Sequence, residues 1–209
     1  KDGQIVLMHN PTVDSRTNTT GNVVDMTAAE LSALDAAYWF VPGVGRPHDR
    51  PEADYVYRGV RTGAKPPPDG FTADDFGVAT LEQVFEAFPD AVFGVEMEEE
   101  AGLGIVPVLA ALIEQYGVQD RIVVSSMGDQ FVTEFMKLMP DVAVSPGITT
   151  MTTWYAGDQG PLPGYRLLQL PPKFGEIEVL TPELIANATA ADLPIWVWAN
   201  EDSQETEAT

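Results

Sequence analysis

The chain has 209 residues, of which 32 are acidic and 11 basic, and its formal net charge is −21. A surface this acidic repels nucleic acid and anionic lipid, so neither is an expected partner. The sequence has no cysteine, which excludes disulfides and thiolate metal sites, and no apolar run long enough to span a membrane. An anionic substrate would therefore need a local positive charge, either clustered arginines or a bound divalent cation. No secretory signal pattern is visible, so we expect a cytoplasmic location, with an extracellular one as the alternative.

The chain opens on a predicted strand that ends in a histidine. Ile5–Met8 is a short apolar run, and the turn signal Asn10-Pro11 ends it. Because side chains alternate along a strand, His9 is expected on the face that carries Ile5 and Leu7. Functional groups of α/β folds gather at the carboxyl ends of strands, so His9 is a candidate functional residue. A histidine that only caps a turn is the simpler interpretation of this position taken alone.

Helical segments follow at intervals along the chain. Capping-box patterns at Thr27 and Thr80 predict helices that run through Leu34 and to about Phe88. Residues 41–75 are rich in proline and glycine and are expected to form a long irregular insertion. Further helices are expected at Ile105–Tyr116, Gln130–Met139 and Pro182–Ala190.

Strands alternate with these helices, which is typical of a parallel barrel rather than an antiparallel sandwich. After the first segment, strands are expected at Val92–Met97, Arg121–Ser125, Val142–Ser145, Arg166–Leu170 and Ile195–Ala199. A (β/α)8 barrel needs eight strands, so the predicted fold is an α/β TIM barrel that is incomplete at both ends. We expect one barrel domain over residues 1–200, followed by the acidic polar tail Glu201–Thr209.

Two carboxylates lie at alternate positions near the end of one predicted strand. Glu96 and Glu98 share one face, whereas Val95 and Met97 point to the other. If the apolar pair packs against helices, the carboxylates face the barrel interior near its mouth. A buried carboxylate needs a cation, a proton or hydrogen bonds, so Glu96 is a candidate metal ligand or half of an acid/base pair. The alternative is a solvated acidic run that begins at Glu98.

Other features give weaker signals. Trp196 and Trp198 share a face of the last strand, where one would pack in the core and the other line a pocket mouth. His48 could belong to a basic patch in the insertion, although loop salt bridges are the more frequent role for such arginines. The arginines near it are Arg46, Arg50, Arg58 and Arg61. No P-loop, dinucleotide-binding glycine pattern or G-x-S-x-G motif occurs.

Taken in order, these segments resemble the glycerophosphodiester phosphodiesterase family. Residues 1–9 resemble the family's D-G-x-x-V-x-x-H-D segment, and residues 11–21 resemble its P-T-x-D-R-T-T-N-G-T-G segment. Later segments resemble the start of the family's insertion, its I-E-x-K strand and its L-Q-V-P and V-x-W-T-V-N strands. These are residues 35–40, 95–98, 168–171 and 196–200.

The resemblance implies a (β/α)8 barrel that hydrolyses glycerophosphodiesters to glycerol 3-phosphate and an alcohol. It further implies two histidines that act as general acid and base around a divalent cation, Ca²⁺ or Mg²⁺. His9 matches the second of these histidines and Glu96 matches a metal ligand. Trp198 and Glu98 are the expected substrate-binding residues, and the expected partner is a small-molecule glycerophosphodiester. The oligomeric state does not follow from the resemblance.

Some positions depart from the family pattern. Asn10 replaces the aspartate after the histidine, Ser15 replaces an arginine, and Glu98 replaces the lysine that pairs with phosphate. The strand with the first histidine and the E-x-D pair of metal ligands would precede Lys1. A non-catalytic homologue that keeps the scaffold as a binding or structural module is therefore the alternative. A glycosidase that uses Glu96 with another carboxylate is a third hypothesis.

Overall fold

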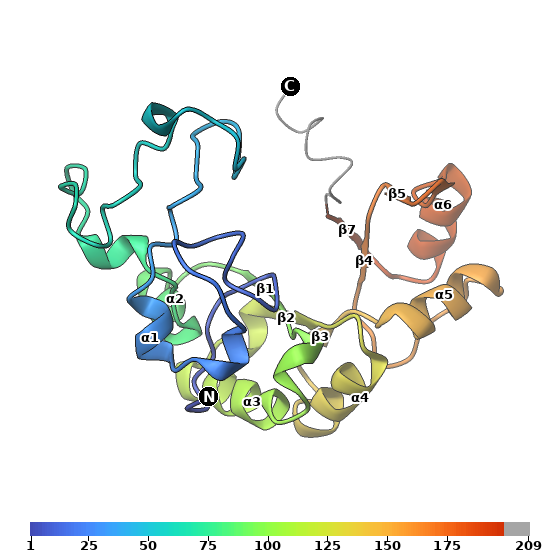
Figure 1. Ribbon diagram of the computed structural model, residues 1–209. Coiled ribbons are helices and arrows are strands. Elements are labelled where there is room, and N and C mark those ends of the chain that lie inside the picture. The colour runs from blue at the N-terminus through green and yellow to red at the C-terminus, as the bar shows by residue number, and fades with distance from the viewer. Residues whose placement is uncertain (199–209) are drawn as a thin grey trace. The chain divides into compact units, whose positions relative to one another are not determined.

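The computed structural model describes residues 1–198. The chain divides into two compact units, one of residues 1–90 and a second that begins at Ala91, and each is described by itself (Figure 1). The expected tail Glu201–Thr209 and the end of the last expected strand lie outside the described residues. No helix in the described part combines the length and the apolar character that crossing a bilayer requires.

The N-terminal unit has two short α-helices, α1 (Ala28–Ser32) and α2 (Leu81–Ala87). Each begins with a capping box, in which the hydroxyl of Thr27 or Thr80 accepts a hydrogen bond from a backbone N–H of the first turn. Both predicted caps are confirmed, although α1 ends two residues before Leu34. The rest of the unit is turns and 3-10 helices, which are η1 (Val23–Asp25), η2 (Glu52–Asp54) and η3 (Ala73–Phe76).

The opening segment is shorter as a strand than expected. Val6 forms an isolated antiparallel bridge with the residue that precedes α2. The predicted strand Ile5–Met8 is therefore wrong in length, because its partner segment enters a helix at the next residue. The predicted alternation is confirmed, since Leu7 and His9 are exposed while Val6 and Met8 pack inward. They pack against the buried residues Val13, Leu31 and Val78.

The second unit carries the parallel strands. β1 (Phe93–Glu96), β2 (Ile122–Ser125) and β3 (Ala143–Val144) form one parallel sheet in that order. β4 (Leu168–Leu170) pairs in parallel with β7 (Ile195–Val197). Two hydrogen bonds connect β3 to the β4 region, from Arg166 N–H to the Val144 carbonyl at 3.2 Å and from Gln169 N–H to Ser145 Oγ at 3.1 Å. The expected strands and their parallel pairing are confirmed, and within residues 1–198 they do not close into a barrel (Figure 1).

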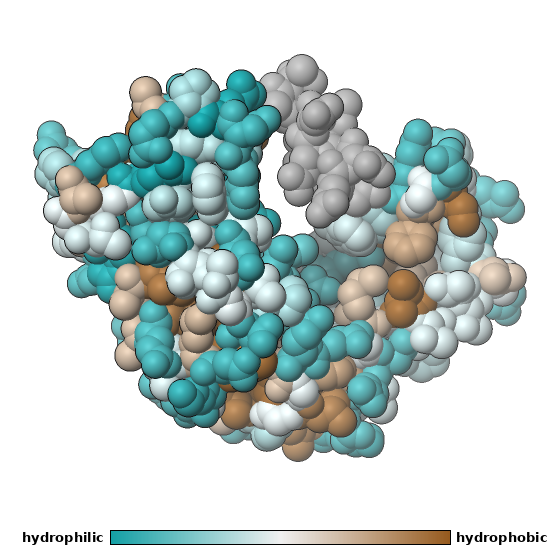
Figure 2. All heavy atoms as spheres, viewed as in Figure 1, coloured by the Kyte–Doolittle hydropathy of each residue, from teal (hydrophilic) through white to brown (hydrophobic). Residues whose placement is uncertain are grey.

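The helices of this unit alternate with the strands along the chain, and α4 contacts both α3 and α5. α3 (Ile105–Tyr116), α4 (Asp129–Leu138) and α6 (Pro182–Ala190) match the three predicted helices within a residue. α3 ends at Gly117, whose φ of 62° is the left-handed conformation that glycine adopts most readily. Figure 2 shows hydrophobic residues gathered over α3 and α4 on the face in view. The unit also has the 3-10 helices η4 (Glu99–Ala101) and η5 (Gln119–Arg121).

Two elements of the second unit were not expected. α5 (Ile148–Ala156) contains four threonines and an isoleucine, and β-branched residues have low helix propensity. Its Met151, Trp154 and Tyr155 nevertheless share one face and pack into a core cluster with β4 and α6. The second element is the hairpin of β5 (Lys173–Phe174) and β6 (Ile177–Glu178), whose strands are too short to give a periodic signal.

Candidate functional site

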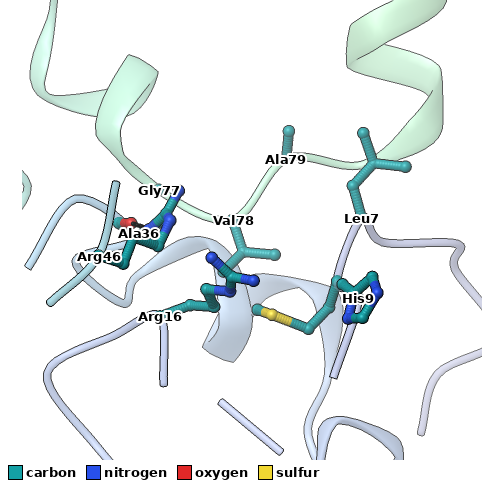
Figure 3. A pocket seen from close by; sticks show the side chains of 9 residues that line it. Leu7, His9, Arg16, Ala36, Arg46, Gly77, Val78 and Ala79 are labelled. Atoms are coloured by element: carbon teal, nitrogen blue, oxygen red, sulfur yellow. Dashed lines mark hydrogen bonds between the residues drawn. The ribbon is translucent and has the colours of Figure 1, made fainter. Parts of the chain in front are cut away.

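His9 lies exposed at the edge of an open pocket of about 390 Å³ in the N-terminal unit (Figure 3). The Nδ1 atom of its imidazole is 2.9 Å from Oδ1 of Asn10. The tautomer with a proton on Nδ1 can donate to this amide oxygen, and in that tautomer Nε2 carries a lone pair. A neutral imidazole in this state can accept a proton at Nε2 from water or a substrate hydroxyl.

Two guanidinium groups line the same pocket. Arg16 lies in a turn, and its backbone N–H donates to the Val13 carbonyl at 3.1 Å. Arg46 belongs to the 41–75 segment and lines the same pocket. The Arg46 Nη1 donates to the Ala36 carbonyl at 2.5 Å, which fixes one side of its planar group. In Figure 3 the Arg16 side chain reaches into the pocket between Arg46 and His9. Burial, and after it the like charge of Arg16, hold the pKa of Arg46 below its usual value.

The arginines of this unit fall into two groups. Arg58 pairs with Glu52 and Arg61 pairs with Asp74, which is the loop salt-bridge role expected for insertion arginines. None of the ion pairs in the described part of the chain includes Arg16 or Arg46. The pocket is therefore a cationic site in a chain whose net charge is −21.

His48 does not join this pocket. Its ring stacks on Trp39 with centroids 4.1 Å apart, and its Nε2 lies 3.3 Å from the carbonyl oxygen of Ser15. The arginine pair of the pocket could not be recognised in the sequence because its members lie 30 residues apart. Only Arg46 belonged to the expected basic patch, and Arg16 carried no signal except its closeness to the candidate His9.

Glu96 ends β1 in the second unit and is exposed. The parallel register places it beside Ser125 of β2, on the face that also carries Gly94. A Cβ atom at Gly94 would lie 3.7 Å from the Trp196 ring and 3.9 Å from the Gln169 side-chain nitrogen, so this face looks toward β4 and β7. The predicted alternation is confirmed, because Met97 is buried while Glu96 is not.

The two tryptophans of the last strand are both partly exposed. Trp196 is 39% exposed and Trp198 is 40% exposed, so the expectation that one of them packs in the core is wrong. β7 ends one residue before Trp198, whose N–H donates to the Leu170 carbonyl at 3.1 Å. Glu98, which follows β1, is half-buried and immediately precedes the 3-10 helix η4.

The predicted site residues are divided between the two units. His9 belongs to the N-terminal unit, whereas Glu96, Glu98 and Trp198 belong to the second, so their convergence stays a prediction. Within residues 1–198 no group of three or more histidine, aspartate or glutamate side chains is arranged to hold a metal ion. Glu96 would supply one carboxylate, whereas Ca²⁺ and Mg²⁺ take about six or more oxygen ligands. The described residues alone do not make a complete metal site.

Solved structures share the fold. A phosphodiesterase from Oleispira antarctica, solved in complex with sn-glycerol-3-phosphate, is 16% identical with a TM-score of 0.63, and the match covers 99% of this chain and 70% of that one. A glycerophosphodiester phosphodiesterase from Agrobacterium tumefaciens is 17% identical with a TM-score of 0.61, and the match covers 96% of this chain and 71% of that one. At this identity the likeness establishes an α/β fold of the kind these enzymes have.

Sequence relatives establish the family. A glycerophosphodiester phosphodiesterase from Caldanaerobacter subterraneus subsp. tengcongensis is 28% identical over 148 residues, which are 69% of this chain and 49% of the relative. A Bacillus subtilis glycerophosphodiester phosphodiesterase is 25% identical over 142 residues, 68% of this chain and 44% of the relative. The chain thus spans about half the length of these curated relatives. The family model described as "Glycerophosphoryl diester phosphodiesterase family" matches residues 1–207, and the chain belongs to this family.

Proposed function

We propose that the chain contributes to a metal-dependent hydrolysis of glycerophosphodiesters to glycerol 3-phosphate and an alcohol. The observation that carries the proposal is the placement of His9, whose imidazole borders a pocket walled by two guanidinium groups. A proton-transfer group beside a cationic pocket is the arrangement that cleavage of an anionic diester needs. Family membership supports the same reaction, and one structural neighbour was solved with glycerol 3-phosphate as its product.

His9 is the proposed acid/base residue of this reaction. Its Nε2 takes a proton from the attacking water as the water oxygen bonds to phosphorus and the P–O bond to the alcohol breaks. The leaving alkoxide takes its proton from a second acid, the role that the resemblance gives to the other histidine of the family. The neutral amide of Asn10 orients the ring through Nδ1 without adding a negative charge beside it.

The remaining site residues have proposed roles in the second unit. Glu96 would supply one carboxylate ligand for a divalent cation, Ca²⁺ or Mg²⁺, which when bound neutralises phosphate charge. Trp198 would offer its exposed ring to the apolar part of the substrate. Glu98 cannot pair with phosphate as a lysine would, so its proposed partner is a substrate hydroxyl. The strands of this unit would belong to a (β/α)8 barrel domain within residues 1–200, with residues 41–75 as its insertion.

A non-catalytic binding module is the second candidate function. Glu98 and Asn10 favour it, because each removes a charge that the family pattern places at the phosphate or at the histidine. Family membership gives the glycosidase hypothesis no support. The phosphodiesterase and the binding module remain as candidates, and only the phosphodiesterase would turn over substrate.

Turnover of glycerophosphocholine with added Ca²⁺ or Mg²⁺ separates these candidates. We expect His9→Ala to lower kcat about 100-fold or more, the usual range for a general acid/base. His48→Ala is the matched control, because that ring stacks on Trp39 outside the pocket, and we expect a change of less than about threefold.

A test variant and a matched control variant probe the metal dependence. We expect Glu96→Ala to raise the cation concentration needed for half-maximal activity, and Glu100→Ala, which removes an exposed carboxylate four residues away, to leave it unchanged. No turnover by the wild-type chain with either cation would favour the binding module instead. Turnover that survives His9→Ala would show that another group transfers the proton.

A further inference from the structure

We propose that a second open pocket, of about 580 Å³ in the unit that begins at Ala91, binds an amino-acid zwitterion. Such a molecule carries an ammonium and a carboxylate on an apolar body. The pocket residues come shortly before β3, β4 and β7 in the chain, so the pocket lies at the amino ends of these strands. Glu96 and Trp198 lie at or beyond the carboxyl ends of parallel strands. This proline-lined pocket is therefore separate from the residues proposed for hydrolysis.

The wall of the proline-lined pocket is rigid for reasons visible in the sequence. Four of its residues are prolines, whose rings fix the backbone φ angle. They are Pro140, Pro161, Pro163 and Pro194. Pro163 and Gly164 form the centre of a turn that the Tyr165 N–H closes by donating to the Leu162 carbonyl at 3.2 Å. Gly164 has a φ of 90°, which glycine adopts readily. A wall that is ordered before binding lowers the entropy cost of binding.

Asp192 supplies the negative end of the pocket. It follows α6 with a φ of 58°, at the position where helices most often have glycine. Its N–H donates to the Thr189 carbonyl at 3.1 Å, and the N–H of the next residue donates to the Ala188 carbonyl at 2.9 Å. An aspartate is unfavourable here, because the left-handed conformation favours glycine and the carboxylate lies at the negative end of the helix dipole. A bound ammonium would offset the electrostatic part of this cost.

Arg166 supplies the positive end of the pocket. Its backbone N–H donates to the Val144 carbonyl at 3.2 Å, which holds its main chain beside β3. Within residues 1–198, neither its guanidinium nor the Asp192 carboxylate takes part in an ion pair or a side-chain hydrogen bond. Both side chains are exposed, so water competes for each of them and a ligand must use both to bind.

The two charges select the class of ligand. A carboxylate pairs with a guanidinium through two parallel hydrogen bonds, and an ammonium suits both Asp192 and the end of α6. A simple anion is repelled by Asp192 and by a net charge of −21, whereas a simple cation is repelled by Arg166. Tyr165, Leu193 and the prolines offer apolar surface to the body of the ligand. The volume lies within the range of small-molecule sites, roughly 300–1,000 Å³.

Isothermal titration calorimetry with two zwitterions and their one-charge counterparts tests the pocket. L-leucine holds both charges at one end of its carbon chain, and 6-aminohexanoate holds them at opposite ends. Their counterparts without the ammonium are 4-methylpentanoate and hexanoate, and those without the carboxylate are 3-methylbutylamine and pentylamine. We expect the better zwitterion to bind with a Kd of about 1 mM or lower, at least about fivefold tighter than either of its counterparts.

One variant at each end of the pocket separates a binding role from a structural one. We expect Asp192→Asn and Arg166→Gln each to weaken zwitterion binding about fivefold or more. Asp192→Asn should also give the zwitterion the same affinity as its counterpart without the ammonium. Asparagine tolerates the left-handed conformation and removes the charge from the helix end, so the melting temperature of Asp192→Asn should stay constant or rise. A purely structural role of Asp192 would not combine lost binding with retained stability.

Glu183→Gln and Lys173→Gln are the matched controls. Glu183 is an exposed carboxylate in the first turn of α6, at the other end of the helix from Asp192. Lys173 is an exposed cation of β5 in the same unit, and neither residue lines the pocket. We expect each control to keep the zwitterion affinity within about twofold of the wild type.

Each outcome of the titrations has a defined meaning. Tighter binding of L-leucine shows that the pocket takes an α-amino acid, and tighter binding of 6-aminohexanoate shows that its charged ends lie further apart; both support the site. The site is overturned if neither zwitterion binds saturably by about 20 mM, or if neither binds better than its counterparts. Unchanged affinity in Asp192→Asn or Arg166→Gln overturns it as well, as does an equal loss in a control. Turnover of glycerophosphocholine enters none of these outcomes, so this site and the proposed hydrolysis stand or fall separately.

Discussion

In the unit that begins at Ala91, apolar strands and helix faces form the core, whereas in the N-terminal unit charged side chains hydrogen-bond to backbone carbonyls. β2 is buried at every position, and α4 buries Phe131, Val132 and Phe135. In the N-terminal unit three arginines reach backbone oxygens far away in the chain. They are Arg46 to Ala36, Arg58 to Tyr38 and Arg61 to Ser32.

The difference has a physical origin. A repeated strand and helix pattern supplies continuous apolar faces, and their burial stabilises the fold without specific partners. Residues 41–75 have no such repeated pattern. They bury single side chains such as Tyr55 and Val60 and add individual polar bonds whose partners must be in place. We therefore expect the second unit to be sensitive to loss of volume and the N-terminal unit to be sensitive to loss of a single donor.

The largest expected effect is a cavity in the second unit. Phe135 is fully buried, and Phe135→Ala should lower the free energy of unfolding by about 3–5 kcal/mol. Phe71→Ala removes the same ring from a site that is 57% exposed, and it should cost about 0.5 kcal/mol or less. Urea unfolding followed by circular dichroism measures both. A loss below about 1 kcal/mol for Phe135→Ala would contradict the core described for α4.

The next effect tests the N-terminal unit through Arg58. This guanidinium donates to the Tyr38 carbonyl at 2.9 Å and lies 4.1 Å from the Tyr38 ring centroid and 3.8 Å from that of Tyr55. Arg58→Ala should cost about 2–3 kcal/mol, because a charged hydrogen bond and desolvated cation–π contacts are lost together.

Two variants separate these contributions. Glu52 is 77% exposed, so Glu52→Gln should cost less than about 1 kcal/mol although it breaks the ion pair. Arg58→Lys keeps the charge but loses the planar group, and it should recover only part of the stability. If Glu52→Gln cost as much as Arg58→Ala, the ion pair rather than the aromatic contacts would stabilise this region.

A pH effect follows in the second unit. Burial alone would raise the pKa of Asp129, but hydrogen bonds from Thr150 and Thr149 hold it below its ordinary value of 3.8. A carboxylate with a depressed pKa stabilises the folded state above its unfolded pKa, and this contribution is lost as the pH falls through the folded value.

Asp129→Asn should therefore cost about 1–2 kcal/mol at pH 7, and the difference from wild type should shrink as the pH falls below about 4. Melting curves between pH 7 and pH 3 measure it. Glu134→Gln, which alters an exposed carboxylate on the same helix, is the control. A difference that is constant with pH would show that the ionised carboxylate is not responsible.

The smallest effect should be the same in both units. Thr80 caps α2 in the N-terminal unit and Thr181 caps α6 in the second, each with its hydroxyl as acceptor. Thr80→Ala and Thr181→Ala should each cost about 1 kcal/mol, and the serine variants should restore most of it. Thermal unfolding compares the four variants. If Thr80→Ala lowered the free energy of unfolding several-fold more than Thr181→Ala, helix capping would contribute more to the stability of the N-terminal unit than to that of the second.

The sequence predicted the second unit better than the first. The helices over residues 105–116 and 182–190 carried clear ends in Gly117 and Thr181-Pro182, and these signals act over a few residues. α5 escaped prediction because its threonines disfavour a helix locally, and only packing of Trp154 in the core overrides that preference. The Ile5–Met8 strand was overestimated, because its length depends on a partner more than 70 residues away.

The candidate site follows the same rule. His9 could be singled out because a strand-end histidine is a local pattern, and Glu96 because alternation sets its face. The arginine pair of the pocket could not, since Arg16 and Arg46 meet only through the path of an irregular segment. The exposure of both Trp196 and Trp198 could not be predicted from the sequence either, because it depends on what surrounds the last strand.

The anchoring of Arg46 on a segment without regular structure gives a bound anion a mechanical role. An anion held by both Arg16 and Arg46 would join two points 30 residues apart and so act as a reversible crosslink that restricts the loop between them. The anion would bind the folded chain more tightly than the unfolded chain, because the two guanidinium groups lie together only in the folded state. At a ligand concentration of 100 times Kd, mass action adds about 2.7 kcal/mol to the folded state. The ligand would then stabilise the segment between these two arginines.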